Sequence, residues 1–354
     1  MTGLLALLTR RIGAGGPITL ADYMADCLLH PEHGYYATRD PLGAAGDFTT
    51  APEISQMFGE LLGLSLAQSW LDQGAPAPFT LAECGPGRGT LMADILRATR
   101  IVPGFHAALS LHLVEASPAL RTTQARTLGR DDITWHDTVE DLPDAALWLV
   151  ANEFFDALPI RQFQRDGAGW RERQVGLDDT GALALGLSGL CSPPELTARL
   201  DDTQDGDIVE LNPAAVAIAT TIGARIATHG GAAIMIDYGD WLTLGDTFQA
   251  VRGHAPGDPL ADPGQADLTA HVDFAALAAA TPSAHSRLAT QGVFLERLGI
   301  TDRARALAAS LTGDALEGHI AAHRRLTHPQ EMGTLFKVIA FYPKGGTPPP
   351  GLEP

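Results

Sequence analysis

The sequence predicts an α/β protein built around a doubly wound parallel sheet, and three observations lead to this prediction. An apolar segment, residues 79–83, runs into three glycines at alternate positions and then into a helical pattern. Further apolar segments alternate with helical patterns over residues 109–152, as in strands that helices cover on both faces. Most of these segments end in polar residues, and ligands bind beyond the carboxyl ends of such strands.

Composition limits the kinds of partner. The 354 residues carry 42 acidic and 24 basic side chains, a net charge of −18, and no basic patch is evident, which argues against nucleic acid or an anionic membrane as a partner. Three cysteines lie far apart and form neither a disulfide framework nor a metal pattern, as expected in a reducing cytoplasm. No apolar run is long enough to span a membrane, so we expect no membrane insertion.

Residues 1–75 are predicted to form a helical N-terminal region. We expect one helix over 18–29 and a long apolar helix from residue 52 to residue 70. Between them, the Gly-rich loop 42–53 could close over a bound cofactor as a lid, with Asp47 as a catalytic candidate that helps to exclude water. The alternative is that the end of this loop is simply a helix start, because a proline and a glutamate fall in its first turn.

The order of strand-like and helical segments divides the rest of the chain into further regions. Residues 76–159 form the cofactor-binding half of the sheet, with strands at 79–83, 109–115, 133–136 and 146–152. Residues 160–205 form an inserted region that begins with a hairpin, and 206–342 supply the remainder of the sheet together with helical insertions on the substrate side. Strands are expected at 231–239, 247–252 and 335–342, and helices at 273–280 and 301–326. The Gly/Pro-rich tail 343–354 is predicted to be disordered.

The glycines identify a class of cofactor. The turn reads G-x-G-x-G from Gly85 to Gly89, whereas a dinucleotide fingerprint requires G-x-G-x-x-G and would need a glycine where Thr90 stands. With an acid, Glu83, just before the turn, the pattern favours S-adenosylmethionine (SAM) over NAD. A tight strand-to-helix turn without a ligand is the alternative.

Acids at the ends of later strands extend the predicted cofactor site. Glu115 could accept hydrogen bonds from both ribose hydroxyls, or it could cap the next helix. Asp137 could receive the adenine amino group, although aspartate is also a good helix-start residue. In full, the residues expected to contact the cofactor are Glu83, Gly85, Pro86, Gly87, Gly89, Glu115, Ala116, Asp137 and Asn152.

The loop after the fourth strand carries the candidates for methyl transfer. Glu153 and Asp156 could clamp a guanidinium, so that its charge is localised on one nitrogen while another attacks. Phe154 and Phe155 could hold the flat cation through their ring faces. The alternative is that the aromatic residues are core and the acids cap a helix.

His271 could act as a base near the substrate. The histidines and acids of the chain show no metal-ligand spacing, so no metal is expected.

Several segments occur in the order found in one family. They are Gly46–Glu60, Glu83–Met92, Ala151–Ile160, Ala266–Phe274, Thr290–Leu295 and Met332–Lys337. Over residues 17–342 the chain closely resembles the MidA family of SAM-dependent methyltransferases, which includes the mitochondrial arginine methyltransferase needed for assembly of respiratory complex I.

The resemblance implies a class I, Rossmann-like methyltransferase fold with a helical N-terminal extension and an inserted substrate-binding region. It implies methylation of a protein arginine, as symmetric dimethylarginine, on a substrate such as a complex I subunit. A small-molecule N- or O-methyltransferase and a SAM-binding assembly chaperone without turnover remain alternatives. The oligomeric state stays open, with a homodimer as one option. A bacterial member would be cytoplasmic, and a eukaryotic one would lie in the mitochondrial matrix.

Overall fold

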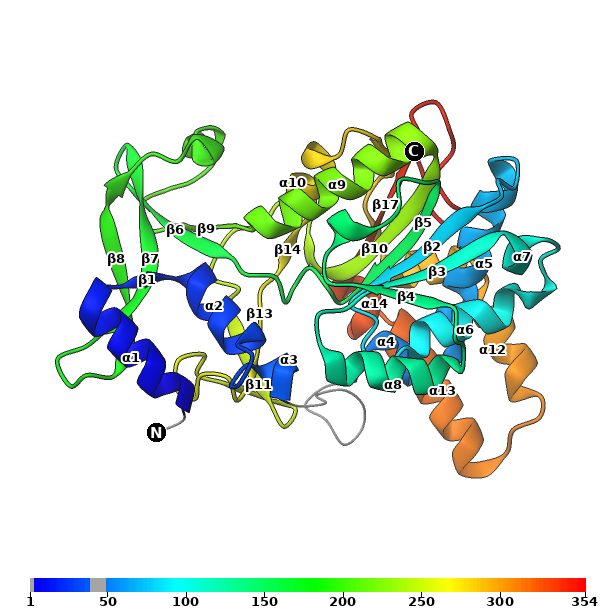
Figure 1. Ribbon diagram of the computed structural model, residues 1–354, viewed down its shortest axis with the longest axis horizontal. Coiled ribbons are helices and arrows are strands. Elements are labelled where there is room, and N and C mark those ends of the chain that lie inside the picture. Colours follow the sequence, from blue (N-terminus) through cyan, green and yellow to red (C-terminus); the bar gives the residue numbers. More distant parts are fainter. Residues whose placement is uncertain (1–2, 39–48) are drawn as a thin grey trace. The chain divides into compact units, whose positions relative to one another are not determined.

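The computed structural model describes residues 3–38 and 49–354 (Figure 1). The chain forms two compact units that interleave along the sequence. Unit 1 comprises residues 1–48, 156–215 and 242–271, and unit 2 comprises residues 49–155, 216–241 and 272–354. These contact-based units cut across the consecutive segments into which the sequence patterns divide the chain.

Unit 2 contains the predicted sheet. Its main path runs β15-β17-β10-β5-β2-β3-β4, with β14 paired to β10 and β16 to β17. The neighbours from β10 to β4 pair in parallel, while β17 is antiparallel to β10. The strands are β2 (Phe79–Cys84), β3 (Leu109–Val114), β4 (Ile133–His136), β5 (Leu147–Asn152), β10 (Gly231–Asp240), β14 (Val272–Asp273), β15 (Ala284–His285), β16 (Ala289–Thr290) and β17 (Phe336–Tyr342).

Helices cover both faces of this sheet, as a doubly wound fold requires, with α9 and α10 on one side and α4 and α6 on the other (Figure 1). The helices are α4 (Ala51–Ile54), α5 (Gln56–Asp72), α6 (Thr90–Ala98), α7 (Phe105–Ala108), α8 (Pro118–Leu128), α9 (Pro213–His229, whose first turn belongs to unit 1), α10 (Phe274–Ala280), α11 (Gln291–Arg297), α12 (Ile300–Ala308), α13 (Gly313–Thr327) and α14 (Met332–Leu335), with short 3₁₀ turns at Thr99–Ile101 and Val139–Asp141. The largest core lies between α5, α6 and the sheet, where Leu81, Trp148 and Ile234 are fully buried.

Unit 1 has two small sheets. In the first, the order is β1-β7-β6-β9 with β8 also paired to β7, and in the second it is β12-β11-β13. Its strands are β1 (Ile18–Thr19), β6 (Arg161–Asp166), β7 (Gly169–Leu177), β8 (Leu183–Cys191), β9 (Ile208–Leu211), β11 (Gln249–Arg252), β12 (Ala255–Gly257) and β13 (Asp267–Thr269). Its helices are α1 (Gly3–Gly15), α2 (Leu20–Leu29) and α3 (Tyr35–Thr38), with 3₁₀ turns at Pro194–Leu196 and Ala198–Leu200.

Side-chain caps explain where two predicted helices differ from the structure. The expected helix over 52–70 is broken by Ser55, which is extended and accepts a hydrogen bond from the Met57 N–H, so that α5 begins anew at Gln56. The expected helix over 18–29 begins two residues later, because Thr19 caps α2 through the Asp22 N–H. Thr19 and its neighbour Ile18 pair with β7 instead.

Two further expectations are corrected. The tail 343–354, expected to be disordered, packs on unit 2: Leu352 is buried, Ser65 donates to the Pro350 carbonyl, and Arg297 pairs with Glu353. Strand 249–252 joins the small second sheet of unit 1 and not the main sheet. Within the described part of the chain, no helix combines the length and apolar character that crossing a membrane requires.

Candidate functional site

The turn after β2 has a backbone that suits glycine. Gly85, Gly87 and Gly89 have φ angles of 61°, 51° and 83°, in the left-handed region. The Gly85 N–H donates to the Val114 carbonyl (3.0 Å), which ties the turn to β3. A Cβ on Gly85 would lie 2.8 Å from Cδ2 of Phe154, so a side chain at this position would collide with the loop after β5.

Glu83, the acid before the turn, is 3% exposed. Its Oε2 has no hydrogen-bond partner among the residues that the structure describes. Burial raises the pKa of Glu83 to about 8; the nearby Glu115 raises it further, while a hydrogen bond from the Met92 backbone acts in the opposite direction. A buried carboxyl group with an unused oxygen is suited to receive a donor, above all a cationic one, from a ligand.

Glu115 lies at the end of β3 in a network of amide groups. Its Oε1 accepts from the Ser117 N–H (2.8 Å), and its Oε2 accepts from Nε2 of Gln124 (3.1 Å). Gln124, which is fully buried, also donates to the Gly87 carbonyl (2.8 Å) and accepts from the Trp135 indole (2.9 Å). Burial raises the pKa of Glu115. Gln124 therefore couples the glycine turn to Glu115, a role that the sequence analysis missed.

The remaining cofactor candidates on this side are exposed. Ala116 is exposed, and so is the side chain of Asp137, which forms an ion pair with Arg121. Arg121 also donates through Nε to the Glu115 carbonyl (2.6 Å). The structure thus brings Asp137 close to the Glu115 loop, and its contact with adenine stays a prediction.

The end of β5 holds Asn152 and Glu153 in a fixed arrangement. Asn152 donates through Nδ2 to Oε1 of Glu153 (3.0 Å), and the same oxygen accepts from the Ala51 N–H at the start of α4 (3.0 Å). Glu153 has a φ of 51°, a conformation that costs a residue other than glycine about 1–3 kcal/mol. Strain of this kind persists where the surrounding contacts enforce it, and it is concentrated at functional sites.

Asp237, on β10, is the acid that enforces this turn, and the sequence analysis did not select it. It is fully buried, and its Oδ2 accepts from the backbone N–H groups of Phe154 (3.1 Å) and Phe155 (2.9 Å). Oδ1 accepts from the Tyr238 N–H (3.0 Å). The signal that could have found it is an acid that ends an unbroken run of apolar residues and glycine, residues 231–236.

The two aromatic candidates differ in burial. Phe155 is 1% exposed and belongs to the interior, whereas Phe154 is half-buried and meets Phe155 edge to face with ring centroids 5.2 Å apart. Phe154 is therefore the better placed of the two to meet a ligand.

The start of α4 is fastened to the same region of unit 2. Besides the bond from Ala51 to Glu153, Oγ1 of Thr90 in the first turn of α6 donates to Oε1 of Glu53 (2.6 Å). Of the predicted lid, residues 49–53 are thus joined to the glycine turn and to β5. Asp47 lies outside the described residues.

Asp156 and His271 belong to unit 1, where their segments lie side by side. The Ala270 N–H donates to the Asp156 carbonyl (3.0 Å), and the His271 N–H donates to Oγ1 of Thr247 (2.8 Å). The Asp156 side chain is buried, and with Asp267 it adds to the burial that raises the pKa of Tyr36.

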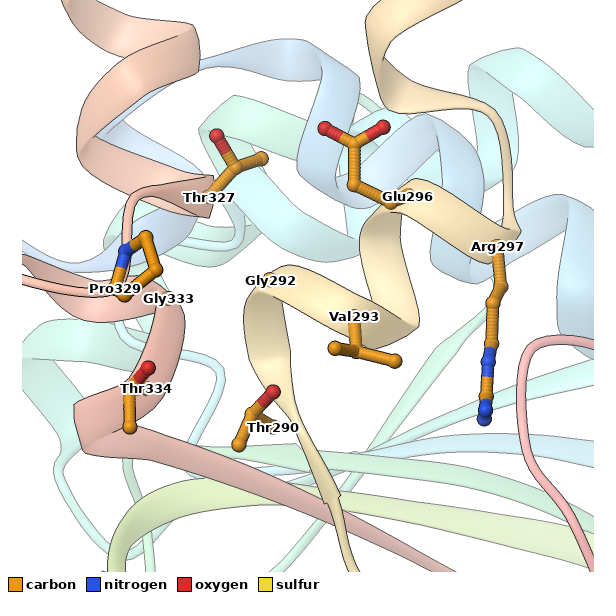
Figure 2. Close-up of a pocket in the computed structure, with 9 residues that line it drawn as sticks. All are labelled: Thr290, Gly292, Val293, Glu296, Arg297, Thr327, Pro329, Gly333 and Thr334. Carbon is orange, nitrogen blue, oxygen red and sulfur yellow. The ribbon is translucent and has the colours of Figure 1, made fainter.

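A cavity of about 490 Å³ opens elsewhere in unit 2, between α11 and the segment from the end of α13 to α14 (Figure 2). Its lining residues are Thr290, Gly292, Val293, Glu296, Arg297, Thr327, Pro329, Gly333 and Thr334. None of them is a predicted site residue. Both charged side chains of its lining interact with other residues of the protein. Arg297 forms an ion pair with Glu353, and Glu296 accepts a hydrogen bond from Thr301 (2.7 Å).

Known proteins match most of the length of this chain. A family model of S-adenosyl-L-methionine-dependent methyltransferases matches residues 61–293. The chain belongs to this family. It is 37% identical to the human mitochondrial protein arginine methyltransferase NDUFAF7, in an alignment of 375 positions that covers 97% of this chain and 84% of that protein. It is 35% identical to the Drosophila melanogaster homologue, in an alignment of 369 positions that covers 95% of this chain and 84% of that protein.

Solved structures agree in fold. A Burkholderia thailandensis protein of the COG1565 superfamily, bound to S-adenosyl-homocysteine (SAH), matches with a TM-score of 0.83 and 33% identity, covering 96% of this chain and 91% of that one. A native B. thailandensis structure of the same superfamily matches with a TM-score of 0.81. The predicted methyltransferase fold and the SAM cofactor are therefore confirmed.

The residues present fit this cofactor. The glycine turn allows close approach of a ligand, and Glu83 offers a buried oxygen without a partner among the described residues. In those same residues, no group of three or more His, Cys, Asp and Glu side chains could hold a metal ion.

Proposed function

We propose that this methyltransferase modifies an arginine side chain of another protein. The relatives named protein arginine methyltransferase, which the chain matches over most of its length, support this acceptor. A respiratory complex I subunit as substrate, and symmetric dimethylarginine as product, are what the family resemblance implies. A cytoplasmic or mitochondrial location stays a prediction.

We assign the cofactor to the ends of β2, β3 and β4. Gly85, Gly87 and Gly89 would let the backbone approach it, Glu83 would receive its ammonium group, and Glu115 would accept its ribose hydroxyls. In the two hydrogen bonds given for Glu115, from Ser117 and Gln124, each carboxylate oxygen accepts one. A carboxylate can accept about four hydrogen bonds in all, so these two leave capacity for the ribose hydroxyls.

SAM supplies a methyl group on a positively charged sulfur, which becomes the neutral thioether of SAH while the acceptor nitrogen gains an N–C bond and releases a proton. The chain must hold the flat guanidinium in line and receive that proton. Glu153 is our candidate, because two hydrogen bonds and a left-handed backbone fix its carboxylate at the end of β5. This is the observation that carries the proposal. Asp156, three residues further along, stays a prediction as the second acid of the clamp.

Glu153→Gln tests this function. The amide keeps an oxygen for the Ala51 and Asn152 donors, so we expect SAH affinity within about threefold of wild type and kcat at least about 100-fold lower. SAH binding is measured by calorimetry. Turnover is measured with methyl-labelled SAM and a protein extract from cells that lack this gene, followed by acid hydrolysis and separation of methylarginines.

The matched control is Glu140→Gln, an exposed acid of the same unit, which should change neither quantity. Label found in a small molecule instead of methylarginine would identify a small-molecule methyltransferase. SAH binding without any transfer by the wild type would identify a binding protein. Full turnover by Glu153→Gln would remove this residue from the mechanism.

A further inference from the structure

Asn152 presents an unused acceptor that the cofactor assignment above does not require. The residue is 8% exposed, and its Oδ1 has no partner in the part of the chain that the structure describes. Leaving a buried carbonyl oxygen unpaired costs about 1–3 kcal/mol, so a ligand that supplies the missing donor gains that free energy.

The direction of this oxygen is fixed by its neighbour. Nδ2 of Asn152 donates to Oε1 of Glu153 (3.0 Å), and the Ala51 N–H holds the same oxygen at 3.0 Å. The side-chain amide is planar and rigid, so fixing its nitrogen also fixes the direction of Oδ1. Glu153 is in turn held by its backbone, because its N–H donates to the Ile236 carbonyl (2.9 Å).

The order of strands separates Asn152 from most of the cofactor site. The glycine turn follows β2, Glu115 follows β3, and Asp137 follows β4, in that order across the sheet. Asn152 ends β5, which lies on the opposite side of β2 from β3. In register, Glu83 lies beside Val150, so Glu83 and Asn152 share one face of the sheet, with Glu83 nearer the ribose side.

We propose that Oδ1 of Asn152 accepts a hydrogen bond from an N–H of the nitrogen that receives the methyl group. This inference rests on the proposed function and deepens it, since it selects a nitrogen acceptor that carries hydrogen. The amide oxygen holds this N–H without removing the proton, and the proton released on transfer goes to a carboxylate such as Glu153. Asn152 thus touches the substrate, and Glu153 also acts as a positioning residue for the amide.

The test compares Asn152→Ala with the wild type in SAH calorimetry and in methyl transfer from labelled SAM to the same protein extract. We expect SAH affinity to stay within about threefold and kcat to fall about 100-fold. Gln124→Met is the contrasting variant, chosen to affect cofactor binding. This variant removes a buried amide from the Glu115 side, so it should weaken SAH binding at least about tenfold.

The outcomes separate this inference from the proposed function. If the wild type transfers no label to arginine, the proposed function fails and the inference fails with it. If the wild type labels arginine and Asn152→Ala does so equally well, the inference alone fails. Loss of SAH binding by Asn152→Ala, in protein that still unfolds cooperatively near the wild-type temperature, would make Asn152 a cofactor ligand and overturn the proposal.

Asn152→Asp keeps the test decisive if the alanine variant does not fold. Aspartate retains the size of the side chain and an oxygen at the Oδ1 position, although its second oxygen faces Oε1 of Glu153. We expect this variant to bind SAH with near wild-type affinity and to retain more turnover than Asn152→Ala. If Asn152→Ala does not fold, the comparison is made with Glu153→Gln, and Asn152→Asp should again retain more turnover. Turnover below that of Glu153→Gln with SAH affinity intact would overturn the role of Oδ1.

Discussion

Gly85 shows how one residue can serve both the fold and the site. Its φ of 61° disfavours any residue with a Cβ, and the hydrogen position that replaces Cβ faces the ring of Phe154. The N–H of the same residue ties the turn to β3. A bare backbone at this point therefore keeps the turn and the loop after β5 in contact.

Gly85→Val should remove cofactor binding and destabilise unit 2. A β-branched residue in the left-handed region costs about 1–3 kcal/mol, and its Cβ would also push Phe154 away. We expect no detectable SAH binding by calorimetry and a lower unfolding temperature.

Gly257→Ala is the control for this variant. It lies in open space, without a positive φ, and should leave both measurements at wild-type values. Normal SAH affinity in Gly85→Val would show that the turn does not form the cofactor site.

At the level of elements, one buried carboxylate joins the end of β10 to the loop that follows β5. Asp237 accepts backbone hydrogen bonds from Phe154 and Phe155, which follow the neighbouring strand β5. Because the loop carries Glu153 just before these two residues, the anchor contributes to the left-handed conformation of Glu153.

Asp237→Asn should weaken this junction. If the amide oxygen takes the place of Oδ2, its NH₂ group faces the Tyr238 N–H and two donors meet. We expect the free energy of unfolding to fall by about 1–3 kcal/mol in urea titration, with a larger relative loss of kcat than of SAH affinity. Asp240→Asn, an exposed acid on the same strand, should be neutral. Unchanged stability and kcat in Asp237→Asn would show that the loop keeps its shape without this anchor.

Periodicity and turn chemistry were sufficient to predict the longer strands of the main sheet, whereas its two-residue strands β14, β15 and β16 were not predicted. The first four strands and the hairpin at Asp166 and Gly167 lie within a residue or two of their predicted bounds. β8 was not predicted, because its alternating leucines are interrupted by glycines at 186 and 189 and several of them are exposed. The ordered tail was missed because its Gly/Pro content does not reveal that Leu352 is buried.

The site was only partly accessible to sequence reasoning. Glycines and strand-end acids have local signatures, so Gly85, Glu115 and Glu153 could be selected. Gln124 and Asp237 could not, because their importance depends on hydrogen bonds to backbone groups at least 37 residues away. For the same reason, the strained φ of Glu153 is visible only in the structure.

At the scale of the whole molecule, the chain passes repeatedly between its two units. Two of these passages, at 155–156 and 271–272, adjoin predicted site residues. Glu153, Phe154 and Phe155 belong to unit 2, whereas Asp156 and His271 belong to unit 1. The predicted roles of Asp156 and His271 in catalysis are therefore tested by variants of each residue, in which both turnover and SAH binding are measured.

Two buried groups of unit 2 should give the molecule opposite pH dependences. Burial lowers the pKa of His112 from 6.5 to about 4, and the adjacent His136 adds to this effect. Between these values the unfolded chain binds a proton that the folded chain does not, so this group makes stability rise with pH. Glu83 acts in reverse, because its pKa rises from 4.5 to about 8 and the folded chain keeps the proton.

Above pH 6.5, Glu83 is the group of this pair that still titrates. Without cofactor, we therefore expect the free energy of unfolding to fall between pH 6.5 and 8 by up to about 1.4 kcal/mol per pH unit, measured by urea titration. Glu83→Gln, which cannot ionise, should remove this fall, whereas Glu317→Gln, an exposed acid on α13, should retain it. If SAH places its ammonium group beside Glu83, its binding favours the ionised carboxyl, so wild-type affinity should increase over the same range. An equal pH slope in wild type and Glu83→Gln would show that this carboxyl does not hold its proton in the folded chain.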